Sequence, residues 1–345
     1  MSRFPNRRVS IKDVASAAGV SLQTVSRVVN KSANVAEPTR ERVLQTIHEL
    51  GYRRNEIARN LIQGRSHSLG VVCAGLDYFG GRQINGGITA EAETQGYSLL
   101  LKEHQPSDPT PPDTFVQSLL DRQVDGFLWM LSDNTADHDQ ILDTLVKKYG
   151  LPVVAMVNPR NPDVPHAAFD NFSAGVMATR HLIERGRRRI VHIAGLPRSW
   201  EAQERVRGWR VAMQEAGLPA GDDRLCYGNW GPEGGVAGLQ ELLVRHPDLD
   251  AVFAGNDNTA LGAMLEAHRR GKHIPQDIAF IGVDDTKGAG WFFPPLTTIR
   301  QNRVEMGRQA VRMLISMIEA RFAGEETVPV TNYVHPPELI VREST

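Results

Sequence analysis

The sequence has few cysteines and no long apolar run, and each absence excludes a class of protein. Its 345 residues include two cysteines, Cys73 and Cys226, too few for a disulfide framework and too far apart for a zinc motif. No segment approaches the roughly 18 consecutive apolar residues of a membrane-spanning helix. The basic first eight residues lead into polar sequence, unlike a secretory signal. We therefore expect a cytoplasmic protein that makes no membrane contact.

Motifs of common enzyme classes are also missing. The sequence contains no G-x-x-x-x-G-K-[ST], no H-E-x-x-H and no G-x-S-x-G. Its glycine pairs, such as Gly80-Gly81, lack the spacing of a dinucleotide fingerprint. Asp284 and Asp285 are consecutive, so at a strand end their side chains point in different directions and form no acid–base pair. We expect no enzyme, no catalytic residues, no cofactor and no metal site.

The charge of the chain is distributed unevenly. Apolar residues make up 41% and charged residues 23%, ordinary values for a globular protein of two to three compact units. Residues 1–66 contain 12 Lys or Arg and 5 Asp or Glu, a net charge of +7. The remainder contains 27 basic and 35 acidic residues, a net charge of −8. This asymmetry points to a polyanion at the N-terminal end, although charge alone leaves a merely solvated surface open.

Residues 10–51 have the pattern of three short helices. Ser10 and Asp13 form a capping box ahead of the first, and Gly19 breaks its apolar stripe where a turn needs a positive φ. Ser21 can cap a second helix over residues 22–30, and a third begins near Pro38. Such a helical hairpin can arise by chance. The charge and the outward polar residues of the second helix favour a DNA-binding helix-turn-helix.

Beyond residue 68 short apolar segments alternate with amphipathic ones. The predicted strands are 69–73, 97–101, 126–130, 153–156, 190–194, 251–253 and 279–283. The predicted helices are 83–95, 137–148, 172–185, 202–216, 256–270 and 302–322. This alternation predicts an α/β body of doubly wound parallel sheets in two lobes, with a ligand cleft at the carboxyl ends of the strands.

Several motifs together resemble one known family. They include residues 9–15, Gly19-Val20-Ser21, residues 24–30, Asp170-Asn171 and Gly208-Trp209, followed by Asn256-Asp257, Gly282-Val283-Asp284-Asp285 and residues 295–299. In this order, over essentially the whole chain, they resemble the lactose-repressor/galactose-repressor (LacI/GalR) family of bacterial transcription regulators. The resemblance implies a helix-turn-helix head and a two-lobed body like a periplasmic binding protein.

The resemblance also implies a division of the chain. The DNA-binding domain would span residues 9–54, and a hinge helix with its linker residues 55–67. The effector-binding and dimerisation domain would span residues 68–345. Within it, lobe 1 would comprise about 68–166 and 300–330, and lobe 2 about 167–299 and 331–345. No leucine heptads follow in the C-terminal residues, which predicts a dimer.

By the same resemblance, the second helix reads DNA and the hinge binds the minor groove. Leu22, Gln23 and Arg27 would contact bases, with Arg27 suited to guanine, while Ser21 is also explained as a simple cap. Leu61 would wedge between base pairs, or else pack on the body. The implied DNA-binding residues are Ser21, Leu22, Gln23, Thr24, Ser26, Arg27, Asn30, Asn55, Ala58 and Leu61.

The resemblance places an effector in the body. The implied effector-binding residues are Tyr78, Phe79, Asp170, Arg205, Trp230, Asn256, Asp284 and Gln301. Arg205 can instead be a helix-surface arginine and Trp230 ordinary core, while Asp257 is expected to brace its helix and Asn171 to be structural. Tyr78 and Phe79 are expected in a loop closing the pocket. A carboxylate that some sugar-binding members carry after strand 153–156 is absent, and Asn158 is a possible substitute.

These observations predict a dimeric regulator of pseudo-palindromic operator DNA. We expect a repressor of carbohydrate-utilisation genes under allosteric control by a sugar-like effector between the lobes. The alternatives are a purine-like or phosphorylated effector, in corepressor or activator mode, and a sugar-binding or sugar-processing protein. An inducer would release the DNA and a corepressor would strengthen DNA binding, whereas turnover of a candidate sugar by the purified protein would favour a sugar-processing protein.

Overall fold

The computed structural model describes most of the chain. The described residues are 9–30, 32, 34–52, 64–74, 76, 79–104, 112–131, 136–157, 164–325 and 332–345. The chain divides into two compact units, a head (Met1–Ser66) and a body (His67–Thr345). Within the described residues, no helix has the length and apolar content to cross a membrane.

The head is a bundle of three helices, α1 (Ile11–Ala18), α2 (Leu22–Val29) and α3 (Glu37–Leu50). The predicted capping box forms, since the Ser10 side chain accepts from the Asp13 backbone while the Asp13 carboxylate accepts from Ser10. Gly19 ends α1 with φ at 64°, a conformation that glycine adopts without strain. Val14, Val25 and Val43, one from each helix, are fully buried and form the core. The predicted helix-turn-helix is therefore confirmed.

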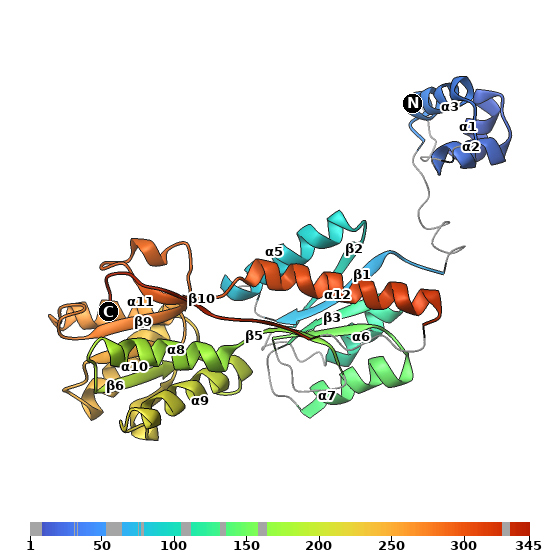
Figure 1. Cartoon of the computed structure of the whole chain (residues 1–345). Coiled ribbons are helices and arrows are strands. Elements are labelled where there is room, and N and C mark those ends of the chain that lie inside the picture. Colours follow the sequence, from blue (N-terminus) through green and yellow to red (C-terminus); the bar gives the residue numbers. More distant parts are fainter. Residues whose placement is uncertain are drawn as a thin grey trace, which may run out of the picture. The chain divides into compact units, whose positions relative to one another are not determined.

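Lobe 1 of the body is built on a six-stranded sheet in the order β11-β5-β4-β3-β1-β2, all neighbours parallel. Helices α5 and α12 cover one face and α6 and α7 the other, each over its own apolar core (Figure 1). The strands are β1 (Ser68–Ala74), β2 (Ser98–His104), β3 (Gly126–Met130), β4 (Val153–Met156), β5 (His166–Phe169) and β11 (Tyr333–His335). The helices are α5 (Phe79–Thr94), α6 (Pro112–Leu120), α7 (Ala136–Asp143) with its π-helical extension (Thr144–Lys148), and α12 (Arg303–Ala323).

Lobe 2 repeats this architecture with the order β12-β10-β9-β8-β6-β7. Its neighbours are parallel except β12, which runs antiparallel to β10. The strands are β6 (Ile190–Ala194), β7 (Leu225–Tyr227), β8 (Ala251–Ala254), β9 (Ala279–Asp284), β10 (Thr297–Arg300) and β12 (Glu338–Ile340). The helices are α8 (Asn171–Glu184), α9 (Trp200–Glu215), α10 (Pro232–Arg245) and α11 (Asp257–Arg269), and the 3-10 turns are Asp222–Arg224 and Ala289–Trp291. The predicted α/β class with two doubly wound sheets is confirmed.

Glycines let neighbouring helices cross closely in both lobes. Each of three helix pairs brings a glycine of one helix against the backbone of the other, in both directions. A Cβ at any of these positions would overlap a carbonyl oxygen of the partner helix. The pairs are Gly87 with Gly307 for α5 and α12, Gly175 with Gly208 for α8 and α9, and Gly235 with Gly262 for α10 and α11.

The chain passes between the lobes at points that differ slightly from the predicted boundaries. β5 extends lobe 1 to Phe169, whereas the sequence assigned residues from 167 onward to lobe 2. β11 also pairs with β5 in lobe 1, although residues from 331 onward were assigned to lobe 2. β10 ends at Arg300 in lobe 2, as its pairing with β9 shows. Short strands such as β5 and β11 carry too few residues for periodicity to place them.

Candidate functional site

One face of α2 carries the predicted base-reading residues. Leu22 is 45% exposed, and Gln23 and Arg27 are also exposed. Val25 and Val28 lie on the opposite side of the same helix, in the core of the head. The helix therefore turns a leucine, an amide and a guanidinium to solvent. This side-chain set can make apolar and bidentate contacts to base edges in a major groove.

The polar residues at the ends of α2 also bond to each other. The Ser21 hydroxyl accepts from the Thr24 backbone at 3.1 Å and lies 3.0 Å from its hydroxyl, so Ser21 caps the helix. The Asn30 amide donates to the Ser26 hydroxyl at 3.3 Å. Each hydroxyl oxygen keeps capacity for a further bond. Asn55, Ala58 and Leu61 lie outside the described residues, so the hinge remains a prediction.

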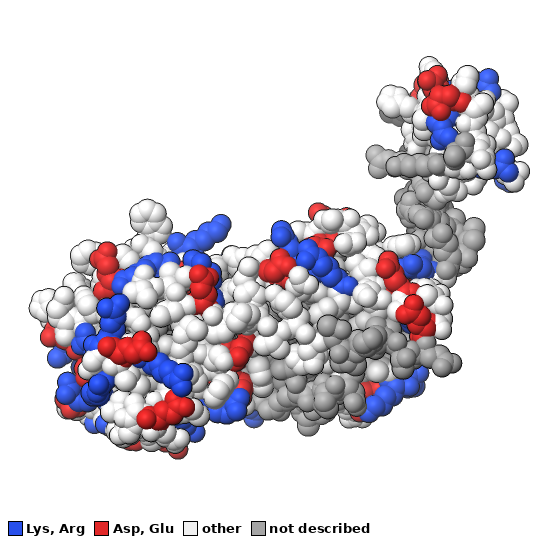
Figure 2. Space-filling view, in the orientation of Figure 1, with Lys and Arg blue, Asp and Glu red and all other residues white. Residues whose placement is uncertain are grey.

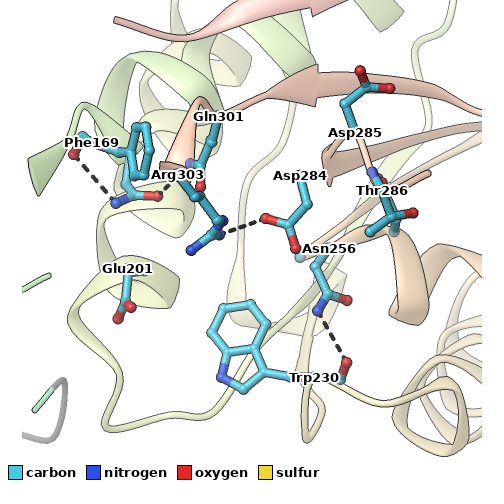
Figure 3. A network of polar contacts seen from close by, with 12 residues as sticks. Phe169, Glu201, Trp230, Asn256, Asp284, Asp285, Thr286, Gln301 and Arg303 are labelled. Carbon is cyan, nitrogen blue, oxygen red and sulfur yellow. Dashed lines mark hydrogen bonds and ion pairs between the residues drawn. The ribbon is translucent and has the colours of Figure 1, made fainter. Parts of the chain in front are cut away.

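In the body, the predicted effector residues follow the carboxyl ends of the strands. Asp170 follows β5, Trp230 follows β7, Asn256 follows β8, Asp284 ends β9, and Gln301 follows β10. Figure 3 shows Trp230, Asn256, Asp284 and Gln301 in one group at the junction of the lobes. We call this group, with Asn171, Arg205 and Arg303, the junction cluster. The carboxyl ends of strands are where open α/β sheets bind ligands.

Arg205 in α9 is 2% exposed, so it is not the surface arginine that the sequence left open. Its Nε donates to Asn171 Oδ1 at 3.0 Å, and one terminal nitrogen donates to the Gly255 carbonyl at 2.5 Å. Its guanidinium carbon lies 5.4 Å from the centroid of the Trp230 ring. Burial lowers the pKa of Arg205 to about 10, so the side chain stays charged at neutral pH. Both of these acceptors are uncharged oxygens.

Trp230 is half-buried and has an unusual backbone, with φ at 66°. Its carbonyl accepts a 3.0 Å hydrogen bond from the Asn256 side chain, which supports this conformation. Gly195, directly after β6, leaves the space for the indole, because a Cβ there would overlap the ring. Asn256 also caps α11 by accepting from the Thr259 backbone at 2.8 Å. The asparagine therefore links the indole to the start of α11.

The consecutive carboxylates after β9 point to opposite sides, as predicted (Figure 3). Asp284 pairs with Arg303, whose terminal nitrogen lies 2.5 Å from Oδ1. Asp285 pairs with Arg300 at 2.8 Å and with Arg342 at 2.5 Å. Both aspartates have positive φ, 120° and 51°. The strained turn thus directs Asp284 into the junction cluster and Asp285 away from it.

Asp257, the first residue of α11, stabilises the turn that contains Asp284 and Asp285. It is fully buried, and its two oxygens accept from the Thr298 hydroxyl at 2.6 Å and the Thr286 backbone at 2.7 Å. Burial, and then the charge of Asp284, raise the pKa of Asp257 to about 7. These contacts agree with the bracing role expected from the sequence.

The crossover residues bind one another. Asp170 caps α8, with both oxygens accepting from Ser173 at 2.8 and 2.6 Å. Asn171 Oδ1 accepts from Arg205 and, at 3.1 Å, from the Gln301 side chain, which fits its expected structural role. Gln301 is 5% exposed, and its Oε1 has no partner within the described part of the chain. That buried oxygen is an acceptor left available for a donor.

Three predicted pocket residues differ from expectation or lie outside the described residues. Phe79 was expected in a loop but begins α5, because the helix starts earlier than periodicity indicated. Tyr78 and Asn158 lie outside the described residues. Among the residues that are described, no group of three or more His, Cys, Asp or Glu can hold a metal ion.

Sequence reasoning missed Arg303 and Phe169. The guanidinium carbon of Arg303 lies 5.6 Å from the centroid of the Phe169 ring. Glu201 lies beside the cluster in Figure 3 and accepts from the Ser199 hydroxyl at 2.6 Å. The sequence signal that could have identified Arg303 and Phe169 is their position, because each lies next to a segment that passes between the lobes.

Basic and acidic side chains alternate over the face of lobe 2 that Figure 2 draws.

Comparisons with known proteins agree with this arrangement. Residues 10–55 match the model of bacterial regulatory proteins of the lacI family. Residues 66–335 match that of the periplasmic binding proteins and sugar binding domain of the LacI family. The chain belongs to the LacI family. It is a helix-turn-helix transcriptional repressor, and both its head and its body match models of this family.

Relatives of this LacI-family repressor match it from end to end. The HTH-type transcriptional repressor PurR of Haemophilus influenzae is 35% identical over 337 residues, covering 97% of this chain and 98% of the relative. PurR of Mannheimia succiniciproducens is 34% identical over 338 residues, with the same coverage. A solved complex of the transcriptional regulator CelR with cellobiose is 33% identical, with a TM-score of 0.71 over 98% of this chain and 100% of that one. The Lac repressor dimer bound to operator and the anti-inducer ONPF is 28% identical, with a TM-score of 0.87 over 98% and 99%.

Proposed function

We propose that this LacI-family repressor binds a pseudo-palindromic operator as a dimer and releases it when a small polyhydroxylated effector occupies the junction cluster. The proposal rests on one observation above all. Trp230, Asn256, Asp284 and Gln301 converge at the carboxyl ends of the strands, and Arg205 of α9 lies against the Trp230 ring. In this proposal the chain represses bacterial carbohydrate-utilisation genes. It acts in the cytoplasm, where its operator lies.

The cluster has the chemistry of a sugar site. A sugar hydroxyl both donates and accepts, and the cluster offers a carboxylate in Asp284 and a guanidinium in Arg205. Gln301 adds a buried oxygen that has no partner within the described residues. The Trp230 ring offers a flat apolar surface for the C–H face of a sugar. The solved CelR structure, with cellobiose, supports the same class of ligand.

The DNA side of the proposal rests on α2. Gln23 and Arg27 are exposed on one face, with Leu22 beside them. Two copies of this helix would read two half-sites when the repressor is a dimer. The similar Lac repressor structure is also that of a dimer bound to operator. The turn after β9 supports self-association, because Trp291 and Phe293 are 88% and 96% exposed. A second copy would cover these aromatic rings.

Fluorescence anisotropy on the DNA upstream of the repressor's own gene tests the proposal. Binding should weaken as salt rises and be relieved by a member of a panel of mono- and disaccharides. Nucleobases and phosphorylated sugars form a second arm, which tests the alternative effectors. If no compound in either arm changes operator affinity, effector control at the cluster is wrong.

A variant pair locates the site. Trp230→Ala should abolish relief by the effector while leaving effector-free operator affinity within about twofold, because the indole lies in the body. Tyr227→Ala is the matched control, an aromatic residue 45% exposed at the end of β7. A response that persists in Trp230→Ala would show that the effector binds elsewhere.

A further inference from the structure

An ion pair in the junction cluster connects the two lobes. Asp284 ends β9 in lobe 2, and Arg303 begins α12, which packs on α5, β3 and β5 of lobe 1. The atoms lie 2.5 Å apart, and the side chains of Arg303 and Asp284 are 13% and 6% exposed. Removing one member of so buried a pair leaves the other without compensation, so the pair resists separation.

Lobe 1 holds the Arg303 guanidinium in place. Phe169 of β5 lies against it, with 5.6 Å from ring centroid to guanidinium carbon. Gly80, in the first turn of α5, leaves the space for its terminal nitrogen, because a Cβ there would lie 2.5 Å from that atom. The Arg303 Nε is buried and has no partner in the described residues. The Arg303 guanidinium thus packs against Phe169 and Gly80 of lobe 1 and bonds across to lobe 2.

Most of the proposed effector residues whose side-chain contacts the structure describes lie in lobe 2. Arg205 lies in α9, Asn256 caps α11, and Asp284 ends β9. A ligand shifts a conformational equilibrium only by its difference in affinity for the two states. A ligand held by lobe 2 alone has no such difference for the orientation of lobe 1. A contact from lobe 1 to the ligand-binding groups is therefore required for control of the head.

We propose that Arg303 is the positioning residue that supplies this contact, tying lobe 1 to the effector-binding carboxylate of lobe 2. The inference rests on the proposed effector site. When an effector hydroxyl donates to Asp284, it competes with Arg303 for the carboxylate charge. The orientation of the lobes then follows the state of Asp284, and the effector need not touch lobe 1 itself.

A neighbouring ion pair provides a control with the same chemistry. Arg300 in β10 pairs with Asp285 at 2.8 Å and with Glu338 of β12 at 3.1 Å. Arg300 and Glu338 lie in strands of lobe 2, and Asp285 lies in the turn after β9. Neither of these ion pairs therefore connects the two lobes. Arg300 is also more exposed than Arg303, at 44% against 13% for the side chains.

Distances between the lobes test the proposal in the full-length protein without a ligand. Spin labels at Asp121→Cys, after α6 in lobe 1, and Val244→Cys, in α10 of lobe 2, both lie at exposed positions. The native Cys73 and Cys226 are buried and should stay unlabelled. Dilution with unlabelled chain leaves one labelled copy in each dimer, so that the pulsed-resonance distance is within one chain.

Arg303→Met should add a second inter-lobe distance, with the population ratio shifted about tenfold from that of the native chain. Arg303→Lys should restore most of the native distribution, because an ammonium can still pair with Asp284. Arg300→Met should leave the distribution unchanged. If Arg303→Met keeps the native distribution, or Arg300→Met changes it equally, the proposal is overturned.

A second variant tests the same contact without removing a charge. Gly80→Ala should displace the Arg303 guanidinium and change the distances as Arg303→Met does. Gly86→Ala, in the same helix, is its control, since a Cβ there meets no atom of the described residues within 4 Å. If Gly80→Ala leaves the native distribution, the assigned geometry is wrong.

Operator anisotropy on the same samples distinguishes failure of this inference from failure of the proposed function. Unchanged inter-lobe distances in a variant that still binds operator reject this inference alone. Absence of operator binding by the native chain rejects the proposed function.

Discussion

The head and the body carry their predicted sites in different ways. In the head, the base-reading residues are near neighbours in one helix, and the helix needs only Val25 and Val28 inward to hold them. In the body, the junction cluster draws on positions from Asn171 to Arg303, on helices, strand ends and crossovers. A site on one helix follows from local periodicity, whereas a site at strand ends depends on the whole topology.

The two sites also differ in burial. The recognition face is exposed, with Leu22 at 45%. In the junction cluster Arg205 and Asp284 are 2% and 7% exposed, and Asp257 beneath them is fully buried. Buried charges depend on fixed partners, so a change in the body affects stability as well as binding. A change on α2 should affect DNA binding alone.

The largest expected effect is on the packing of the body. Gly262→Val would force a side chain into the carbonyl of Pro232 where α10 and α11 cross. We expect the free energy of unfolding of the body to fall by about 3 kcal/mol or more, because backbone cannot yield as a side chain can. Urea denaturation followed by tryptophan fluorescence measures this loss.

Gly86→Val is the control for that substitution, at an exposed position where no atom in the described part of the chain lies within 4 Å of the added Cβ. Equal losses in the two variants would mean that the helix crossing is looser than the structure indicates.

The far-ultraviolet circular dichroism that is retained after the body unfolds reports whether the head folds independently.

Asp257 should make the stability of the body depend on pH. Its pKa is raised to about 7, so the folded state binds the proton more tightly than the unfolded chain does. Stability should therefore be greatest below about pH 4 for this group and decline as pH rises to about 7, by up to about 1.4 kcal/mol for each unit. Asp257→Asn removes this decline, and urea midpoints over the interval compare the two chains. Parallel profiles would contradict the assignment.

Arg27→Ala should have a smaller effect, confined to DNA. If Arg27 makes a bidentate contact to guanine, its loss costs about 1–3 kcal/mol on the operator and much less on random DNA. Anisotropy on both DNAs measures the difference. Arg42→Ala, an exposed arginine in α3, is the control. An equal loss on operator and random DNA would assign Arg27 to phosphates.

Much of the fold could be predicted from the sequence. The buried strands β3, β4, β6, β8 and β9 were found because continuous apolar runs bounded by turn residues mark them. β7 and β10 were missed, as were α6 and α10. β7 has only three residues, and β10 reads as Thr-Thr-Ile-Arg, so neither contains a continuous apolar run of four residues. Such strands are defined by their neighbours in the sheet.

The sequence by itself determined the helix-turn-helix, the α/β class and the residues at most strand ends, because each depends on local patterns of a few residues. The tertiary structure decided how those residues are used. It buried Arg205 and brought Arg303 to Asp284. The physical reason is that such contacts join residues from different elements. Their distances follow from the pairing of strands and the close crossing of helices.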